Sequence, residues 1–469
     1  MSRPPSRPIK VSLVSLGCPK NLVDSEVMVG KLTGGAFELQ SAPEGSDVVV
    51  VNTCGFIDAA KEESIDTICE MLDLKAQGAV KGVVVAGCMV RRYGSEMQQE
   101  LPDVDAFLDI SDYSDAPRVF KTIHARTSGE TSPARAESIA PFVGGGADKS
   151  PTADLGRSLL TLPHTAYLRV SEGCDRKCAF CAIPLIRGTQ KSKPIDVLVK
   201  EAKRLAAAGV KELSLVGEET TAYGSDLDMP YGEGIAPLLR ALSKVKGIEW
   251  IRLLYAHPGS FKRSLIDEIR DNPKVAKYVD MPIQHGDDEI LKRMKRGTPA
   301  GKIRDLVATL RAEIPGITLR TTILVGFPGE TDTRFEHLMD TLRATRFERV
   351  GCFTYSREEG TSSYDLTGRV SGKVAAERRR KVMLLSRKIT KERNKALLGT
   401  TIRVLLDAVD GDRAVGRSEG DAPQIDCRVH VRAPAGITLE AGAFIDVRVD
   451  GVLGYDLKGT ACVGAGVPA

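Results

Sequence analysis

Three cysteines stand close together in one short stretch of the chain. Cys174, Cys178 and Cys181 occur in the run Glu-Gly-Cys-Asp-Arg-Lys-Cys-Ala-Phe-Cys, so their thiolates can converge on one face of a single loop. This arrangement suits a cubane iron–sulfur cluster, which normally takes four cysteine thiolates. The local run supplies three, which leaves one iron open to a small-molecule ligand. We therefore expect a cluster that takes part in chemistry and does more than store electrons.

A zinc site is an alternative use of these cysteines. Structural zinc usually takes its four ligands in two separated pairs, and the next cysteine, Cys352, is far away in the sequence. A disulfide framework fits less well, because ten cysteines in 469 residues are too dilute for a disulfide-stapled scaffold. We find no signal peptide and no apolar stretch long enough to span a membrane, so we expect a reduced protein in the cytoplasm.

Three more cysteines follow strand-like apolar runs in the N-terminal part of the chain. The run Val-Val-Val-Val-Asn-Thr leads into Cys54, and similar runs lead into Cys18 and Cys88. Helical patterns between the runs predict a doubly wound parallel sheet, whose strand ends meet at one edge. We therefore expect these cysteines to face one another and to hold a second cluster. The alternative, a small buried hydrophobe at each position, explains one such cysteine more easily than three. A glycine adjoins each cysteine and lets the backbone approach a cluster: Gly17, Gly55 and Gly87.

The central spacing, with the aromatic Phe180 before its last cysteine, resembles that of the radical S-adenosylmethionine (radical SAM) enzymes. In that family the open iron chelates the amino and carboxylate groups of the methionine moiety. One-electron reduction then splits the sulfonium and releases a deoxyadenosyl radical. The motifs Gly-Cys-Pro-Lys-Asn, Asn-Thr-Cys-Gly-Phe-Ile and Gly-Cys-Met extend the likeness over nearly the whole chain, to the methylthiotransferases within these enzymes.

This resemblance implies two [4Fe-4S] clusters and S-adenosylmethionine as cofactors. The cluster on Cys18, Cys54 and Cys88 would carry an exogenous sulfur that is methylated and passed to a substrate carbon. One S-adenosylmethionine would donate the methyl group, and a second would yield the radical that abstracts hydrogen. A flavodoxin- or ferredoxin-type reductant and a sulfur donor are implied as partners.

Six strand-like runs between residues 167 and 355 are spaced so that one helix fits between each pair. They predict an open, partial (β/α)6 barrel with its reactive groups at the carboxyl ends of the strands. Glu218 and Glu219 follow the second run, where the family places a contact to the methionine amino group and related enzymes often have Gln-Asp. His257 and His285 end the next two runs, and each suits a structural hydrogen bond as well as a substrate contact. The resemblance assigns cofactor contacts to Phe180, Glu218, Arg320, Gly326, Glu330 and Glu358.

Composition divides the chain further. Residues 125–160 are rich in Ser, Gly, Pro and Ala and predict a flexible linker between an N-terminal domain (1–124) and a radical SAM core (161–396). Residues 367–395 hold eleven Lys or Arg against two Glu and read as a helix. We expect this helix to cover a barrel edge, and a nucleic-acid patch is the alternative.

Residues 397–469 show about five short strands, which predict a small β-barrel of the oligonucleotide-binding type. It resembles the TRAM domain that ends these methylthiotransferases. Its seven basic and ten acidic residues argue against direct RNA binding and favour a basic protein partner. We expect that partner to contact an acidic loop that contains Glu419, Asp421 and Asp426.

The loop at residues 416–426 resembles the branch of the family that modifies the β-carbon of an aspartate in small-subunit ribosomal protein twelve. Our interpretation is therefore a methylthiotransferase acting on that aspartate. The nearest alternative is the same chemistry on a tRNA adenosine, N6-isopentenyladenosine. An alternative of another class is a non-catalytic iron–sulfur electron carrier or sensor.

Overall fold

The N-terminal sheet is built from short, buried, valine-rich strands. The computed structural model describes residues 7–32, 35–128, 142–143 and 153–462. The strands of this sheet run parallel in the order β2-β1-β3-β4-β5-β6. They are β1 (Ile9–Ser15), β2 (Phe37–Gln40), β3 (Val48–Thr53), β4 (Val83–Gly87), β5 (Ala106–Leu108) and β6 (Phe142–Val143).

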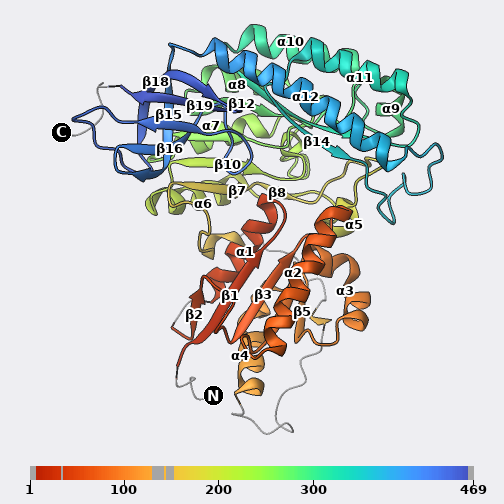
Figure 1. The fold of residues 1–469 in the computed structure, drawn as a ribbon, viewed down its shortest axis with the longest axis vertical. Coiled ribbons are helices and arrows are strands. Elements are labelled where there is room, and N and C mark those ends of the chain that lie inside the picture. The colour runs from red at the N-terminus through yellow and green to blue at the C-terminus, as the bar shows by residue number, and fades with distance from the viewer. Residues whose placement is uncertain (1–6, 33–34, 129–141, 144–152, 463–469) are drawn as a thin grey trace.

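Helices cover both faces of this sheet (Figure 1). Alternate valines of β3 point to opposite faces, and each set belongs to a separate apolar cluster. One cluster takes in α1 (Pro19–Lys31) and α4 (Ala116–Thr127), and the other takes in α2 (Asp58–Ala76) and α3 (Cys88–Glu100). The prediction of a doubly wound parallel sheet is confirmed.

The central unit is a second parallel sheet that stays open, in the order β14-β13-β12-β11-β10-β7. Its strands are β7 (Thr165–Arg169), β10 (Glu212–Val216), β11 (Trp250–Leu253), β12 (Val275–Asp280), β13 (Thr318–Val325) and β14 (Arg349–Thr354). Its helices are α5 (Ile183–Arg187), α6 (Ile195–Ala207), α7 (Ile235–Ser243), α8 (Arg263–Asp271), α9 (Asp288–Arg293), α10 (Ala300–Glu313) and α11 (Asp332–Thr345). A two-stranded ribbon of β8 (Ser171–Glu172) and β9 (Lys191–Ser192) adjoins β7. This arrangement confirms the predicted partial six-stranded barrel.

The basic segment forms α12 (Gly372–Ala396), which lies along the edge strand β14 (Figure 1). Val382 and Ile389 are buried, and Arg379 Nε donates to the carbonyl of Cys352 at 3.0 Å. The helix therefore covers an edge of the open barrel, as its sequence predicts.

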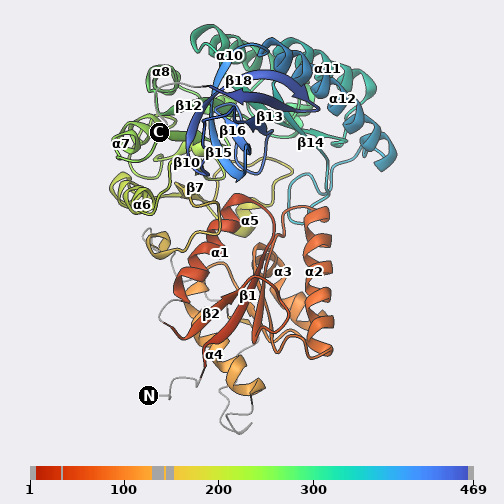
Figure 2. The ribbon, with the colours of Figure 1, turned by 60° about the vertical axis from the view of Figure 1, so that its left-hand side comes forward.

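The C-terminal unit is a closed barrel, β15-β16-β17-β19-β18. Its strands are β15 (Thr401–Asp410), β16 (Arg413–Ser418), β17 (Val429–Arg432), β18 (Phe444–Leu453) and β19 (Asp456–Ala461). The barrel lies beside the central sheet, and the N-terminal unit lies below that sheet (Figures 1 and 2). The prediction of a small β-barrel is confirmed.

The acidic loop between β16 and β17 is not a free surface, which corrects our expectation that it contacts a basic partner. Asp421 is 1% exposed and accepts from Arg349 Nη2 at 2.7 Å. Asp426 accepts from the Tyr278 hydroxyl at 2.6 Å, and a Glu419 carboxylate oxygen accepts from the backbone of Lys277 at 2.6 Å. The charge count of the barrel alone missed Arg349 and Arg320 of the core, which pair with Asp421 and Asp426.

The same loop fills the inner side of the open barrel. Ala422 belongs to one apolar cluster with Val23 and Val27 of α1 and with Tyr167 and Tyr278 of the central strands. The adjacent residues of those central strands point the other way and belong to a different apolar cluster, the core that packs under the helices. An N-terminal helix and a C-terminal loop therefore meet inside the central unit and tie the units together.

A buried carboxylate anchors the C-terminal barrel. Glu212, at the start of β10, lies 3.0 Å from Arg252 Nη2 and 2.5 Å from Arg417 Nη1, and these side chains are 0–4% exposed. Nearby, Trp250 and Phe444 pack edge to face with ring centroids 4.8 Å apart. Removing one partner of an ion pair buried this deeply is strongly destabilising. We therefore expect Glu212 to make the largest contribution to the stability of this contact.

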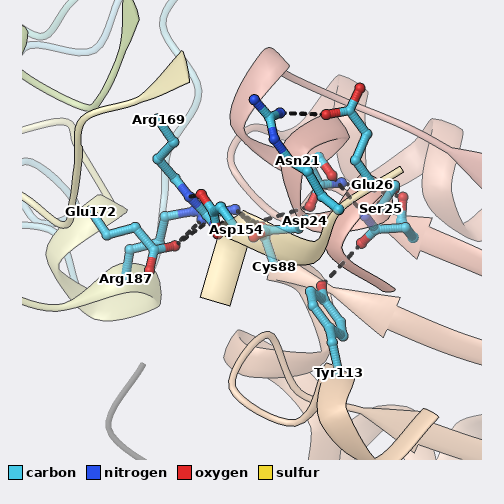
Figure 3. Close-up of polar contacts among 12 residues, drawn as sticks. Asn21, Asp24, Ser25, Glu26, Cys88, Tyr113, Asp154, Arg169, Glu172 and Arg187 are labelled. Atoms are coloured by element: carbon cyan, nitrogen blue, oxygen red, sulfur yellow. Dashed lines mark hydrogen bonds and ion pairs between the residues drawn. The ribbon is translucent and has the colours of Figure 1, made fainter. Parts of the chain in front are cut away.

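A second buried ionic network joins the N-terminal unit to the core (Figure 3). Asp24 of α1 pairs with Arg169, at the end of β7, and lies 2.7 Å from Arg187 Nη2, at the end of α5. Asp154 also pairs with Arg169, at 2.6 Å. The buried positive charges of these arginines are compensated, because carboxylates surround each guanidinium group.

The described end of the predicted flexible linker takes part in this network. Asp154 and Arg157 are buried, and the backbone of Ser158 donates to the carbonyl of Glu26 at 3.0 Å. Residues 153–160 therefore form an ordered connection, unlike the mobile one we expected. The three glycines at 144–146, on which that expectation also rested, lie outside the described residues.

Removing the Glu212 charge should loosen the barrel from the core. We expect Glu212→Gln to lower the free energy of unfolding by about 3–5 kcal/mol, because two buried arginines lose their carboxylate. The chain's single tryptophan, Trp250, lies at this contact and reports it by fluorescence in urea. Glu249→Gln is the control, since its pair with Arg403 joins the same units but is 43–44% exposed and should cost less than about 1 kcal/mol. Equal losses would contradict the anchoring role.

Asp24→Asn tests the other junction. The variant leaves Arg169 and Arg187 partly unpaired, and we expect hydrogen exchange to accelerate in α1 and α5 while the interior of the central sheet stays protected. Asp58→Asn, at a side chain that is 59% exposed and paired with Lys61, should leave exchange unchanged. Unchanged exchange in Asp24→Asn would show that the network does not hold the units together.

Candidate active site

The three N-terminal cysteines meet at the carboxyl edge of the first sheet, as predicted. Cys18 follows β1 and caps α1, Cys54 follows β3 directly, and Cys88 follows β4 as the first residue of α3. These strands are neighbours in the order β1-β3-β4. Their side chains are close enough that the charges of Cys18 and Cys88 act on Cys54. We call these cysteines the N-terminal triad.

Glycines beside this triad are required by the protein's own packing, which differs from the reason we predicted. Gly17 has φ of +87°, and a Cβ there would lie 2.7 Å from Cys54 Cβ. Gly87 has φ of +103°, and a Cβ there would collide with Asn52 Oδ1 and the backbone of Thr53. These positions let the strand ends approach one another, and so bring the cysteines together.

Two asparagines that sequence reasoning left unassigned hold the strand ends in place. Asn21 Nδ2 donates to the carbonyl of Leu16 at 2.7 Å, and Asn52 Nδ2 donates to Ser25 Oγ at 2.7 Å. Tyr113 donates to Asn52 Oδ1 at 3.4 Å. The positions of both asparagines in the cysteine motifs, Cys-Pro-Lys-Asn and Asn-Thr-Cys, could have signalled this role.

Two thiols of this triad, Cys54 and Cys88, are buried, and Cys18 is partly exposed. Burial, together with the nearby sulfurs of Cys18 and Cys88, raises the pKa of Cys54 to about 12. Burial also raises the pKa of Cys88, while Arg187, which donates to its Sγ at 3.2 Å, opposes that shift. Binding iron must therefore release protons from Cys54 and Cys88.

The second group, which we call the central triad, lies in the loop after β7 and β8. The loop is pinned by hydrogen bonds from Cys174 N to the Gly188 carbonyl at 3.0 Å and from Cys181 N to the Cys178 carbonyl at 3.2 Å. Arg296 Nη1 donates to Cys178 Sγ at 3.3 Å. The loop follows the first barrel strand, where reactive groups are expected.

Within the described residues, no three His, Cys, Asp or Glu side chains converge on a single point as the ligands of one metal ion do. A cubane cluster bonds each thiolate to a different iron and does not need that convergence. Both triads consist of thiols from neighbouring segments, with cationic arginine at a sulfur of each, and this donor set fits an iron–sulfur cluster.

Near the central triad, Glu218 is the ionisable side chain with the most unused hydrogen-bonding capacity. Both of its carboxylate oxygens are buried without a hydrogen-bond partner among the described residues, and Arg187 Nε is 3.7 Å away. Burial raises its pKa, and its charge acts on Cys174 and Cys181. A carboxylate in this state can receive a cationic ligand group.

Glu219, by contrast, has hydrogen-bond donors at both of its carboxylate oxygens. It accepts from Arg176 Nε at 2.7 Å, from Ser260 at 2.5 Å and from Tyr231 at 2.9 Å. Of the two acidic residues after β10, Glu218 is therefore the one free to bind a ligand.

The turn predicted to bind the adenosine side of the cofactor is closed by hydrogen bonds among its own residues. The backbone of Gly326, with φ of +79°, donates to Glu330, and His285 Nε2 lies 3.3 Å from that carboxylate. Phe180 packs edge to face on Phe327 with centroids 6.5 Å apart. The structure thus brings the cysteine loop and this turn together, and gives His285 a structural partner.

Two other predicted cofactor residues are bound by protein groups. Arg320 donates to Asp280 at 2.7 Å and lies 3.4 Å from Asp426. Glu358 accepts from Arg92 at 2.6 Å and from Lys61 at 3.0 Å, across the contact between the core and the N-terminal unit. Neither is left with a free charge at the site.

His257 presents one ring nitrogen to the site. Its Nδ1 accepts from the backbone of Gly259 at 3.0 Å, while Nε2 is buried without a partner among the described residues. Burial, reinforced by Arg296 and Arg176, lowers its pKa to about 2, so the ring is neutral. A neutral ring of this kind can donate a hydrogen bond from Nε2.

Sequence reasoning missed Lys20 and Tyr255. Lys20 is 7% exposed, and its Nζ lies 4.0 Å from the centroid of the Tyr255 ring. Although burial disfavours the charged form, Tyr255, Cys18 and Glu218 raise the pKa of Lys20. The position of this lysine two residues after Cys18 was the available signal.

Family models match three parts of the chain. The radical SAM superfamily matches residues 168–342, the uncharacterized protein family UPF0004 matches residues 10–109, and the TRAM domain matches residues 398–462. None of the helices in the described ranges is long and apolar enough to cross a bilayer.

Curated relatives match nearly the whole chain. The ribosomal protein uS12 methylthiotransferase RimO of Symbiobacterium thermophilum is 43% identical over 97% of this chain and 91% of its own length. The RimO of Geotalea uraniireducens is 42% identical over 96% of this chain and 98% of its own.

A solved structure of the radical S-adenosylmethionine methyltransferase TsrM from Kitasatospora setae, with cobalamin and a [4Fe-4S] cluster bound, resembles the fold. Its TM-score is 0.53 at 15% identity, and the match covers 76% of this chain and 77% of that one. Fold, cysteine triads and relatives agree, and the chain belongs to the RimO family of radical SAM methylthiotransferases.

Proposed function

We propose that this radical SAM methylthiotransferase adds a methylthio group to the β-carbon of an aspartate in ribosomal protein uS12. The relatives named for that substrate support the proposal. The observation that carries it is the pair of cysteine triads at the carboxyl edges of two parallel sheets, joined through Asp24, Arg169 and Arg187.

Each triad would hold one [4Fe-4S] cluster with one iron left for a further ligand. When bound, the central cluster with S-adenosylmethionine supplies radical chemistry, and the N-terminal cluster supplies the sulfur. Glu218 would bind the cationic amino group of the cofactor, because neither of its carboxylate oxygens accepts a hydrogen bond from the described residues. Gly326 and Glu330 would shape the adenosine side, and Phe180 would cover it.

Arg320 and Glu358 are proposed as positioning residues and not as cofactor contacts. Their charges are already engaged by Asp280 and by Arg92. The reaction also needs electrons and sulfur from outside the chain, and we propose a flavodoxin- or ferredoxin-type reductant and a separate sulfur donor, in the cytoplasm.

The two alternatives have less support. The curated relatives are named for a ribosomal protein and not for tRNA, and the match to a catalytic superfamily does not favour a mere electron carrier. The acidic loop no longer argues for a protein substrate, since its carboxylates face the core.

Iron content tests the two sites. We expect anaerobically reconstituted protein to hold about eight irons, because each triad takes a four-iron cluster. Replacing Cys174, Cys178 and Cys181 by Ala should leave about four. Full loading of that variant would mean that the central loop is not a cluster site.

The division of labour is tested by replacing Cys18, Cys54 and Cys88 with Ala. This variant should still cleave S-adenosylmethionine to deoxyadenosine but should not methylthiolate uS12, because the sulfur has no cluster to bind. Cys69→Ala, at an exposed cysteine outside both triads, is the control and should keep both activities. A folded triad variant that lost both activities would refute the separation.

The substrate is tested by mass spectrometry of uS12 and of tRNA from a strain that lacks the gene. We expect the methylthio group to be lost from the aspartate of uS12 and the tRNA to be unchanged. Loss from tRNA alone would replace the proposal with the adenosine alternative.

A further inference from the structure

We propose that Lys20 binds the side-chain carboxylate of the target aspartate and so places its β-carbon between the two triads. This inference rests on the proposed function. It assigns substrate recognition to a buried ammonium group on α1, close to Tyr255.

Lys20 is a buried cation without a carboxylate partner. It is 7% exposed, and it forms no ion pair with any carboxylate among the described residues, although most buried arginines of this chain are paired. Its Nζ lies 4.0 Å from the centroid of the Tyr255 ring, and Glu218, whose charge acts on Lys20, is beyond ion-pair distance. A buried ammonium is costly unless an anion joins it, so the site is incomplete in the free chain.

The position of Lys20 is between the two triads. It follows Cys18 by two residues on one side. On the other side its ammonium lies 4.0 Å from the ring centroid of Tyr255, which follows β11 at the carboxyl edge of the central sheet. An anion bound to Lys20 would therefore lie between the place where a hydrogen is removed and the place where sulfur is delivered.

Tyr255 is held in a strained conformation that keeps its ring against Lys20. Its φ is +58°, which is unfavourable for an aromatic residue. Hydrogen bonds on both sides of its backbone fix this geometry: its N–H donates to Asp280 at 3.1 Å, and its carbonyl accepts from Thr220 at 3.2 Å. The ring attracts the ammonium without neutralising it, which leaves the charge available to an incoming anion.

The chemistry of the target identifies that anion. In aspartate the carboxylate is bonded directly to the β-carbon, so a cation that fixes the carboxylate also fixes the reacting carbon. The amino and carboxylate groups of S-adenosylmethionine would instead bind at the central triad and Glu218. Asparagine has the same shape as aspartate but lacks its charge, and Lys20 should reject it.

The test is equilibrium binding of two uS12 peptides, with the target aspartate or with asparagine in its place, to cluster-loaded enzyme. We expect wild-type enzyme to bind the aspartate peptide about 10- to 100-fold more tightly, the range for a buried charge-assisted hydrogen bond. Lys20→Met should bind both peptides alike. Lys31→Met, the same change at the exposed end of the same helix, should keep the wild-type preference.

The following results would contradict the inference about Lys20. Equal affinity of wild-type enzyme for both peptides, which needs no variant, would overturn the inference. A preference that survives in Lys20→Met, or a loss confined to S-adenosylmethionine affinity, would also overturn it. If Lys20→Met failed to load iron, Lys20→Gln would take its place. Methylthiolation of the aspartate peptide by wild-type enzyme tests the proposed function separately, and its absence would overturn both.

Discussion

The fold depends on one buried carboxylate, Asp24, which holds the arginines of two different segments of the core. Asp24 lies on α1, six residues after Cys18 at its N-cap, while Arg169 precedes the central triad and Arg187 follows it. The pairing therefore fixes one triad relative to the other. Since Arg187 also donates to Cys88, the same network reaches the sulfurs of the N-terminal triad directly.

Several other contacts between units follow the same pattern, with charges buried in pairs inside apolar surroundings. Glu212 joins Arg252 to Arg417, Asp421 joins Arg349, and Glu358 joins Arg92. Ion pairs of this kind add little net stability over apolar contacts but are expensive to break. They suit a protein whose separate units must keep one fixed arrangement around a shared site. Lys20 differs from these residues, because no carboxylate lies within ion-pair distance of its charge in the described part of the chain.

Reasoning from charge failed where it treated one unit in isolation. The C-terminal barrel has an excess of acidic residues, yet Asp421 and Asp426 of its loop face Arg349 and Tyr278 of the core. Arg320 and Glu358 likewise look available for a cofactor in the sequence, whereas the structure pairs them with Asp280 and Arg92. A charge shows its role only when the side chains across a domain contact are known.

The sequence alone determined the elements and the grouping of the cysteines. Period-two and period-3.6 patterns, short turns and cysteine spacing are local properties, and they sufficed for both sheets, the barrel and the two triads. The tertiary structure alone decided which polar groups remain free. It showed that Glu218 is unsatisfied where Glu219 is not, and that Lys20 lies over Tyr255. Those facts depend on contacts between residues up to hundreds of positions apart, which no local pattern encodes.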